Sequence, residues 1–500
     1  MTKRKIFFIL FTVIAPFFCF GQKDKIELVQ ADVLEGRGKG VRVLKGNVIF
    51  KQDGSLMYTD SAYFYPKENA LDAFGRVRIV QPDESTITSS KLFYNGNTKL
   101  ARFRNNVVLV DGNSTVKTEA LDYNMADKTA VYNDGATILD PPNTLTSVKG
   151  RYDSQNRVFN FRENVKVVNQ TDDFILYSQH LLYNVETKIA TFLGPSTIIS
   201  KGDTIQAESG NYNTITKESD MDQSVILSGT YEISGNNIIY NKLLDRGTLK
   251  GNVRMYSKED DITIYGNDAI HRGDLGYTKV FGDAVMVKVS DGDTLFLNAD
   301  TLVSVDKKET TGEKKLLAYY NSKVFKKDFQ AVADSLVYNF ADSLISFYEQ
   351  PVLWNLDNQI LGDTIYVQIV NGHIDMMYLR QNSFIISLDE LKNYNQVKGR
   401  DIDAWFFNDS IRKVDVIGNA QSIYFVLEGD TALTGMNKVI SSNMKMFFEN
   451  NKVKTISFLK KPEGSFIPPQ LIQEPDTRLK GFKWWSERRP TREQVVKRKL

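Results

Sequence analysis

Short stretches of alternating apolar and polar residues run along most of the chain and are separated by polar turns. After the glycine of GNVIF (46–50), GRVRI (75–79) and GNVRM (251–255), the second and fourth residues are apolar, whereas the residue between them varies. Period-two alternation predicts β-strands with one buried and one solvated face. We expect the inward stripe to consist of Val48, Phe50, Val77, Ile79, Val107, Leu109, Val165, Val167, Val253, Met255, Ala284, Met286, Phe325 and Trp354.

The alternating stretches repeat at a nearly constant interval. Tyr65, Tyr94 and Tyr123 close three similar stretches and lie 29 residues apart, and related stretches continue to Phe448, thirteen in all. A period of about 20–50 residues is typical of stacked-repeat proteins, whose units bury their apolar faces only against their neighbours. The sequence therefore predicts an all-β fold, an elongated β-jelly-roll or β-helix-like solenoid of about thirteen strand–turn repeats of ~29 residues.

Two kinds of turn are expected in each repeat. Asparagine follows the closing tyrosine in several repeats, as in Tyr94-Asn95. Because asparagine tolerates the left-handed backbone conformation, we expect these asparagines to occupy the left-handed positions of tight turns. Glycines such as Gly75 are expected to mark a second turn between two separate strands.

The N-terminus has the features of a secretory signal. Lys3, Arg4 and Lys5 precede a largely apolar run of 13 residues that ends at Phe18. This run is too short to span a bilayer comfortably, so residues 1–21 are predicted to be a cleaved signal peptide. A lipid anchor on Cys19 and an uncleaved N-terminal anchor are the alternatives.

The rest of the chain is predicted to contain four segments. Residues 22–305 and 318–465 form two regions of β-repeats, and the polar segment 306–317 is an exposed loop or a joint between them. Residues 466–500 form a basic tail, in which Thr491 and Gln494 are suited to cap a short helix. Trp484 and Trp485 are candidates to pack this tail onto the last repeat. Two equally weighted alternatives are that the tail binds an anionic membrane surface or a partner's acidic rim, and that it is a solvated or disordered end.

Charge and reactive residues exclude several functions. The formal net charge is +2, and nine Lys or Arg against two Glu gather in residues 478–500, so a basic nucleic-acid-binding face is absent from the repeats. The single cysteine lies in the predicted signal peptide, and the three histidines are isolated. Nucleophile, Walker and dinucleotide motifs are absent. We predict no catalytic residues, no metal site and no cofactor.

The repeated motifs resemble those of the OstA-like/LptA family of periplasmic lipopolysaccharide-transport proteins, and they are also similar to the N-terminal domain of LptD. The resemblance rests on the strand motifs Gly75–Ile79 (GRVRI) and Gly251–Met255 (GNVRM). It also rests on Ala120–Asn124 (ALDYN), which is followed by Lys128–Ala130 (KTA). The match is good over roughly the first 290 residues and weaker to about residue 460.

This resemblance implies an open-seamed β-jelly-roll that holds lipid acyl chains inside and leaves the headgroup outside. It implies a non-enzymatic periplasmic bridge protein that binds lipopolysaccharide or a related lipid during outer-membrane assembly, with the outer membrane as a further place of association. End-to-end strand pairing with other lipopolysaccharide-transport components, or with further copies of this chain, is the expected mode of assembly. The inward stripe is then a distributed lipid-binding surface without a single pocket.

Two other classes of function remain open at this point. A structural β-solenoid, used as an envelope spacer or an adhesin, would need only a dry core, and apolar stripes are usually core. A polysaccharide-cleaving β-helix enzyme would need converging carboxylates on one face. Outward cations such as Arg78 and Lys166 are interpreted as a solvated strand face.

Overall fold

The computed structural model describes residues 25–169, 171–290, 293–307, 312–408, 410–429, 431–449 and 452–497. The predicted signal peptide, with Cys19, lies outside these residues. The chain divides into two compact units, unit 1 (Met1–Gln170) and unit 2 (Thr171–Leu500). Within the described ranges, no helix has both the length and the apolar character needed to cross a membrane.

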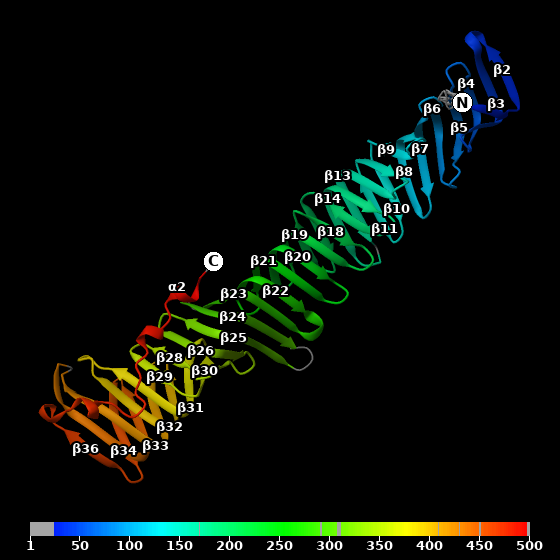
Figure 1. Ribbon diagram of the computed structural model, residues 1–500. Coiled ribbons are helices and arrows are strands. Elements are labelled where there is room, and N and C mark those ends of the chain that lie inside the picture. The colour runs from blue at the N-terminus through cyan, green and yellow to red at the C-terminus, as the bar shows by residue number, and fades with distance from the viewer. Residues whose placement is uncertain are drawn as a thin grey trace, which may run out of the picture. The chain divides into compact units, whose positions relative to one another are not determined.

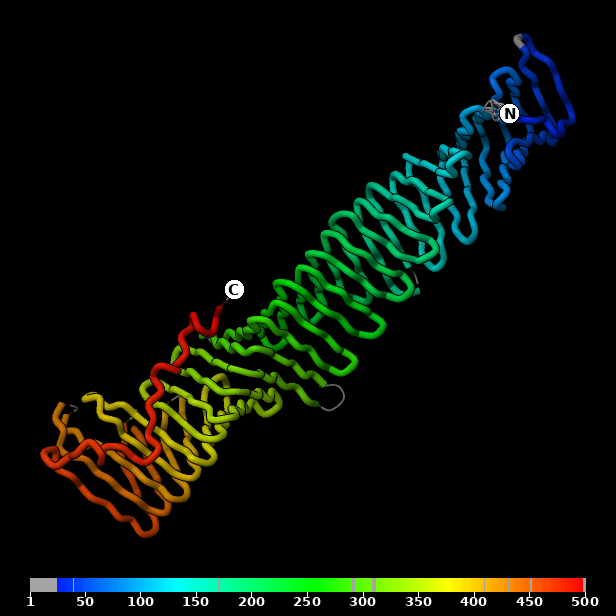
Figure 2. Tube along the Cα trace, viewed as in Figure 1, coloured from blue at the N-terminus to red at the C-terminus, as the bar shows by residue number. Residues whose placement is uncertain are grey.

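Unit 1 is built from antiparallel strands, and each long strand between Val41 and Asn124 pairs with the next along the chain (Figures 1 and 2). A 3-10 turn, η1 (Gly38–Gly40), precedes the first long strand. The strands are β1 (Glu27–Gln30), β2 (Val33–Arg37), β3 (Val41–Gln52), β4 (Ser55–Tyr65), β5 (Ala70–Val80), β6 (Thr86–Asn95), β7 (Leu100–Asp111), β8 (Ser114–Asn124), β9 (Thr129–Tyr132), β10 (Ala136–Asp140), β11 (Asn143–Ser147), β12 (Lys149–Asp153) and β13 (Val158–Asn169).

Unit 2 continues the same antiparallel pattern. Its strands are β14 (Phe174–Asn184), β15 (Ile189–Phe192), β16 (Ser196–Ser200), β17 (Asp203–Ala207), β18 (Ser209–Asn213), β19 (Glu218–Leu227), β20 (Tyr231–Asn241), β21 (Arg246–Ser257), β22 (Ile262–Arg272), β23 (Tyr277–Ser290), β24 (Asp293–Lys307), β25 (Glu313–Phe325), β26 (Phe329–Asn339), β27 (Leu344–Tyr348), β28 (Val352–Asn355), β29 (Asn358–Leu361), β30 (Thr364–Val370), β31 (His373–Leu388), β32 (Tyr394–Phe407), β33 (Ser410–Glu428), β34 (Ala432–Glu449), β35 (Lys452–Leu459) and β36 (Glu463–Ile467). The short helices are η2 (Gly273–Leu275), η3 (Pro469–Leu471), η4 (Glu474–Thr477), η5 (Ser486–Arg488) and α2 (Arg492–Val495). The prediction of an all-β, repeated-strand fold is confirmed.

The long strands bend near their middle, where the pairing register shifts. In β5 the bend consists of Gly75 (φ +74°) and Arg76 (φ +36°), both in the left-handed region. The expected turn at Gly75 is therefore wrong: it is a bulge that bends one continuous strand. Asp60 on β4 fixes this bend, because it accepts hydrogen bonds from Arg76 Nε at 2.9 Å and Nη2 at 2.7 Å.

The bends divide each unit into two facing walls. In unit 1, wall A comprises 48–59, 77–89, 107–118, 136–147 and 165–169, and wall B comprises 41–45, 61–74, 91–104, 120–132 and 149–162. In unit 2, wall A includes 253–265, 284–290, 293–298, 322–333, 352–361, 383–398, 420–429 and 431–441. Wall B of unit 2 includes 237–250, 268–281, 301–307, 312–319, 335–348, 364–380, 401–408 and 410–417. The free ends of the two walls meet along a line, which we call the seam.

The turns of wall B are closed by asparagine side chains. Asn95 Oδ1 accepts hydrogen bonds from the backbone N–H groups of Asn97 and Thr98, both at 3.0 Å. The left-handed residue of this turn is Lys99 (φ +57°). The expectation that the asparagine itself is left-handed is wrong, because its side chain forms an Asx turn and leaves the left-handed position to a later residue.

The polar segment 306–317 lies inside unit 2 and away from the boundary between the units. Its two ends belong to β24 and β25, which pair with each other, with Asp306 opposite Lys314. Residues 308–311 of this segment lie outside the described residues.

The basic tail (468–497) is ordered and lies against the outer face of wall A in unit 2. It runs back from beside β36 toward β24 and β25, where α2 ends its path (Figure 1). The predicted capping box is confirmed: Thr491 Oγ1 accepts from Gln494 N at 3.3 Å, and Gln494 Oε1 accepts from Thr491 N at 3.0 Å.

Candidate functional site

Hydrogen bonds across the seam close unit 1. Tyrosines at the free end of wall B donate their O–H groups to amide or carboxylate oxygens at the free end of wall A. The three pairs are Tyr94–Gln52 at 2.8 Å, Tyr123–Gln81 at 3.1 Å and Tyr152–Asp111 at 2.8 Å. Burial, aided by the charge of Asp53, raises the pKa of Tyr94, so this phenol remains a neutral donor over the physiological range.

Ion pairs cover the same line on the solvent side. Lys99 Nζ lies 2.6 Å from Asp53, and Lys128 Nζ lies 2.5 Å from Asp83. Burial opposes ionisation of Asp83, but the hydrogen bond from Lys128 and those from Ser85 outweigh it and lower the pKa of Asp83 to about 2. The open seam implied by the resemblance is therefore not what unit 1 has: polar pairs join its walls at three successive repeats.

The predicted stripe of unit 1 lies inside this closed seam. All eight of its residues are at most 2% exposed: Val48, Phe50, Val77, Ile79, Val107, Leu109, Val165 and Val167. Aromatic rings fill the space between the walls, as in the contact of Phe50 with Phe64 at 5.3 Å between ring centroids. The interior of unit 1 is packed as a core.

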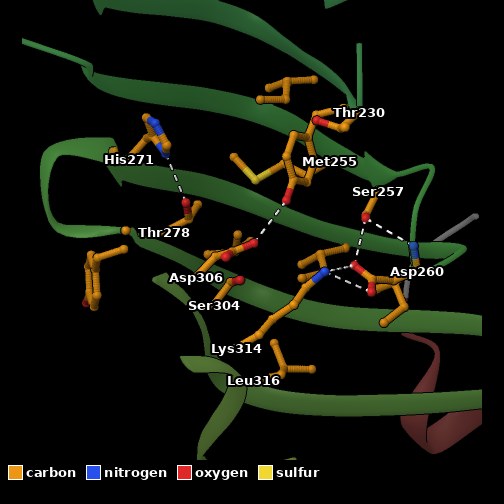
Figure 3. A pocket seen from close by; sticks show the side chains of 18 of the residues that line it. Thr230, Met255, Ser257, Asp260, His271, Thr278, Ser304, Asp306, Lys314 and Leu316 are labelled. Carbon is orange, nitrogen blue, oxygen red and sulfur yellow. Dashed lines mark hydrogen bonds and ion pairs between the residues drawn. The ribbon is translucent and has the colours of Figure 1, made fainter. Parts of the chain in front are cut away.

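Unit 2 contains a large cavity between its walls, which we call cavity 1. It encloses about 1140 Å³ and is lined by residues of β20 to β25 and by Phe340. Its apolar lining includes Ile233, Met255 and Ile264, which are only partly buried (Figure 3). Tyr240 does not bridge this seam, because it donates its O–H to Asp245 on the same wall at 2.8 Å.

Polar groups surround the mouth of cavity 1. Tyr231 Oη donates to Asp306 at 3.3 Å, and Lys314 Nζ lies 2.7 Å from Asp260 (Figure 3). Burial opposes protonation of Lys314, but its hydrogen bond to Asp260 and the nearby acidic charges raise its pKa. Elsewhere in the lining, a hydrogen bond of 2.9 Å joins His271 Nδ1 and Thr278 Oγ1. The cavity thus combines an apolar floor with a mainly acidic, hydrogen-bonded rim.

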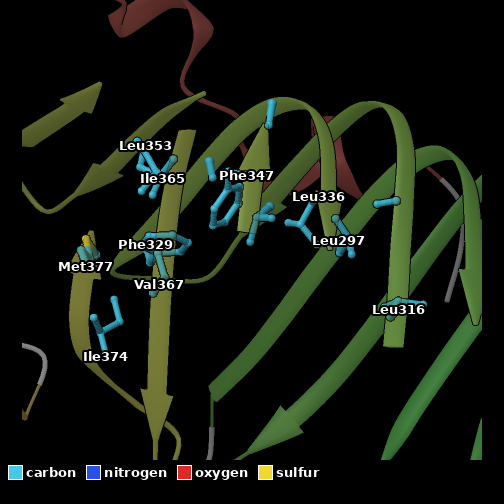
Figure 4. Close-up of a cluster of buried hydrophobic side chains, with 14 of the residues drawn as sticks. Leu297, Leu316, Phe329, Leu336, Phe347, Leu353, Ile365, Val367, Ile374 and Met377 are labelled. Atoms are coloured by element: carbon cyan, nitrogen blue, oxygen red, sulfur yellow. The ribbon is translucent and has the colours of Figure 1, made fainter. Parts of the chain in front are cut away.

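Two smaller cavities follow along the interior of unit 2. Cavity 2, of about 370 Å³, is lined by Leu297, Phe329, Leu336 and Phe347, which belong to the buried cluster of Figure 4. Cavity 3, of about 400 Å³, is lined by residues of β28 to β35. The interior of unit 2 is thus hollowed at cavities 1, 2 and 3, and many polar side chains line cavity 3. Lipid binding along a distributed inward stripe stays a prediction.

The predicted stripe residues of unit 2 divide between core, cavity and outer face. Val253 and Ala284 are buried in the core, whereas Met255 lines cavity 1 and Met286 lines cavity 2. The prediction that Phe325 faces inward is wrong. It pairs with Phe296, and directly paired residues share a face of the sheet. Arg492 of the tail lies over the Phe296 ring at 5.1 Å, so this is the outer face.

Trp354 is also wrongly placed in the inward stripe. It is 1% exposed and packs with Val332, Val352 and Trp485 of the tail, on the outer side of wall A. Its neighbour Leu353 belongs to the inner cluster. The tail thus buries the second face of these strands, which explains why the sequence here is continuously apolar instead of alternating.

Sequence reasoning missed the charged residues that line the cavities. Lys288 follows Met286 by two residues and lines cavity 2, and Lys314 lies at the mouth of cavity 1. The period of two places Lys288 on the inward face of β23, which is the pattern that could have identified it. Across the described ranges, no group of three or more His, Cys, Asp or Glu side chains could hold a metal ion.

Residues 23–174 match the family model of OstA-like proteins. No curated protein matches the chain. Among solved structures, the chain is similar to LptH from Pseudomonas aeruginosa, described as the LptA-homologous periplasmic component of a conserved lipopolysaccharide transport device. That similarity has 12% identity and a TM-score of 0.14, and it covers 29% of this chain and 85% of the other. The predicted OstA-like resemblance is confirmed by the family match, which covers the strands of unit 1 and the first residues of unit 2.

Proposed function

We propose that this protein, whose residues 23–174 are OstA-like, is a periplasmic lipid carrier of the lipopolysaccharide-transport type. It binds the acyl chains of lipopolysaccharide or a related lipid in the interior of unit 2 and has no catalytic step. The observation that carries this proposal is the series of cavities between the walls of unit 2, of which cavities 1 and 2 have mainly apolar linings.

The physical basis of such a carrier is removal of acyl chains from water. Each buried CH₂ group gains about 0.8 kcal/mol, so a lipid with several chains needs a continuous apolar shelter to cross an aqueous compartment. Cavity 1, at about 1140 Å³, has the size and mixed lining of a ligand site. Partly buried Ile233, Met255 and Ile264 supply apolar surface that a bound chain would cover.

The two units have different parts in this proposal. Unit 1 has a packed interior and a seam closed by hydrogen bonds, which supports a structural role and a role in assembly. Its first strands also expose apolar side chains, with Val33 44% and Leu34 53% exposed on β2. Such an edge is suited to strand pairing with another transport component or with a second copy of this chain.

In-cell photo-crosslinking tests the carrier function. A photoreactive residue replaces Met255 in cavity 1, and matched variants carry it at the buried Leu109 of unit 1 and at the exposed Arg78. We expect a lipopolysaccharide adduct at position 255 and none at position 78. An adduct at position 109 would mean that the seam of unit 1 opens in the cell, and would extend the lipid path into that unit.

The absence of any lipid adduct at position 255, in a folded and secreted protein, would refute the carrier function. A structural spacer would then be favoured, since the packed core of unit 1 needs no cargo. Lipid analysis of the purified protein gives a second, independent readout: a spacer carries none.

A further inference from the structure

Cavity 2 has an inward lysine at its mouth. Lys288 lies two residues after Met286 on β23, and both side chains line the cavity. It pairs with Leu295 of β24, which lines the same cavity, so the lysine faces the interior. Its ammonium group lies 5.9 Å from the ring centroid of Tyr338 on the opposite wall. A cation therefore stands where the apolar interior meets the seam.

Lys288 makes no ion pair with a carboxylate in the part of the chain that the structure describes. The carboxylate of Asp293, which also lines cavity 2, lies 3.6 Å from Lys326 instead, and Lys326 also pairs with Asp328 at 3.1 Å. Lys326 thus serves both carboxylates, and neither of them forms an ion pair with Lys288. Among the described residues that line cavity 2, Lys288 and Lys326 stand against the carboxylate of Asp293. A half-buried cation on an apolar wall is costly unless an anion accompanies it.

We propose that Lys288 anchors the anionic head of an amphiphile whose single acyl chain occupies cavity 2. The inference rests on the proposed carrier function and narrows it to acidic lipids at this site. At about 30 Å³ per water-sized group, the 370 Å³ of cavity 2 hold roughly a dozen such groups, the scale of one medium-length chain. Tyr338 and Ser343, which also line the cavity, supply hydroxyl groups to the same head.

The rims of the first two cavities differ in charge. Glu259, Asp260 and Asp306 lie at the rim of cavity 1, where they neutralise Lys314. We therefore place the anionic head at cavity 2, and acyl chains alone at cavity 1.

Equilibrium binding of matched amphiphiles to the delipidated full chain tests this proposal. Laurate and dodecanol share a 12-carbon chain and differ in charge, and inorganic phosphate alone supplies an anion without a chain. We expect laurate to bind at least about tenfold more tightly than dodecanol, because a charge-assisted hydrogen bond forms only with the carboxylate. Phosphate alone at the same concentrations should not compete.

Three variants assign the effect. Lys288→Met should abolish the preference for laurate and leave dodecanol affinity unchanged, whereas Lys288→Arg should keep the preference. Lys250→Met, which removes an exposed lysine from β21, is the matched control and should behave as wild type. Equal binding of laurate and dodecanol by wild type, or competition by phosphate alone, overturns the anchor while the carrier function stands. Failure of both amphiphiles to bind overturns both.

Discussion

Buried glutamines of wall A attach the tail to the outer face of that wall, and Gln359 offers the sharpest test. Gln359 is 0% exposed, and its amide makes two bonds to the tail backbone. Nε2 donates to Lys483 O at 2.7 Å, and Oε1 accepts from Trp485 N at 2.6 Å. Gln359→Leu keeps a similar volume and removes both bonds.

The expected loss follows from these contacts. Each neutral hydrogen bond contributes about 1 kcal/mol net, so the two together contribute about 2 kcal/mol. Lys483 is exposed and Trp485 half-buried, so the freed backbone groups regain water when the tail detaches, and no larger penalty is added. At 1.4 kcal/mol per factor of ten, the detached state should become roughly 30-fold more populated.

Native-state hydrogen exchange measures this opening directly. The Trp485 amide should exchange about 30-fold faster in the variant, because its acceptor is gone and the tail opens more often. The amide of Ile360 on β29 reports whether the strand itself remains folded. Gln206→Leu, at an exposed glutamine of β17, is the matched control. A change below threefold at Trp485, with Ile360 protected, would refute the argument that buried glutamines hold the tail.

Three further predictions concern unit 1, each measured as a urea unfolding midpoint of the full chain. Gly75→Ala should cost at least about 1–2 kcal/mol, because φ is +74° and the new Cβ would lie 2.6 Å from a carboxylate oxygen, whereas Gly194→Ala, with open space around it, should cost little. The pKa of Asp83 is lowered to about 2 in the folded state, so its stabilisation is complete above about pH 4 and is lost as the pH falls toward 2. Because this pair is so exposed, the contribution of Asp83 to stability should be at most about 1 kcal/mol. Lys128→Met should remove most of that contribution and of its dependence on pH. Tyr152→Phe should cost about 1.5–3 kcal/mol, since it removes the O–H donor of a buried carboxylate; an unchanged midpoint would contradict a closed seam.

The alternation of the sequence predicted the interior of unit 1 well, because each strand there has one buried and one wet face. It failed by one residue at Phe325, since a one-residue shift reverses the face of a strand. In β3 the buried Val48 and Phe50 come one and three residues after the second left-handed residue of the bend, Asn47. In β25 the left-handed residue of the bend is Asn321, and the residues one and three positions after it, Ser322 and Val324, are the buried ones. Phe325 is one position further along and therefore faces outward.

Other features depended on partners that are distant in sequence. The closed seam of unit 1 arises from bonds such as Tyr94–Gln52, between residues 42 positions apart, and alternation carries no information about such pairs. Trp354 was misplaced because its covering partner, Trp485, comes from the tail. The continuous apolar run Val352–Trp354 indicated a strand buried on both faces, but not what covers the second face.

The position of the tail has a consequence for synthesis. The tail covers strands made more than 100 residues earlier, such as β28 and β29, as the bond between Gln359 and Trp485 illustrates. During translation, the outer apolar side of wall A stays uncovered until the tail has left the ribosome. A chain interrupted before Trp485 would therefore display the buried Trp354 and its neighbours to chaperones and proteases, which makes the loss of the tail detectable on the surface of unit 2.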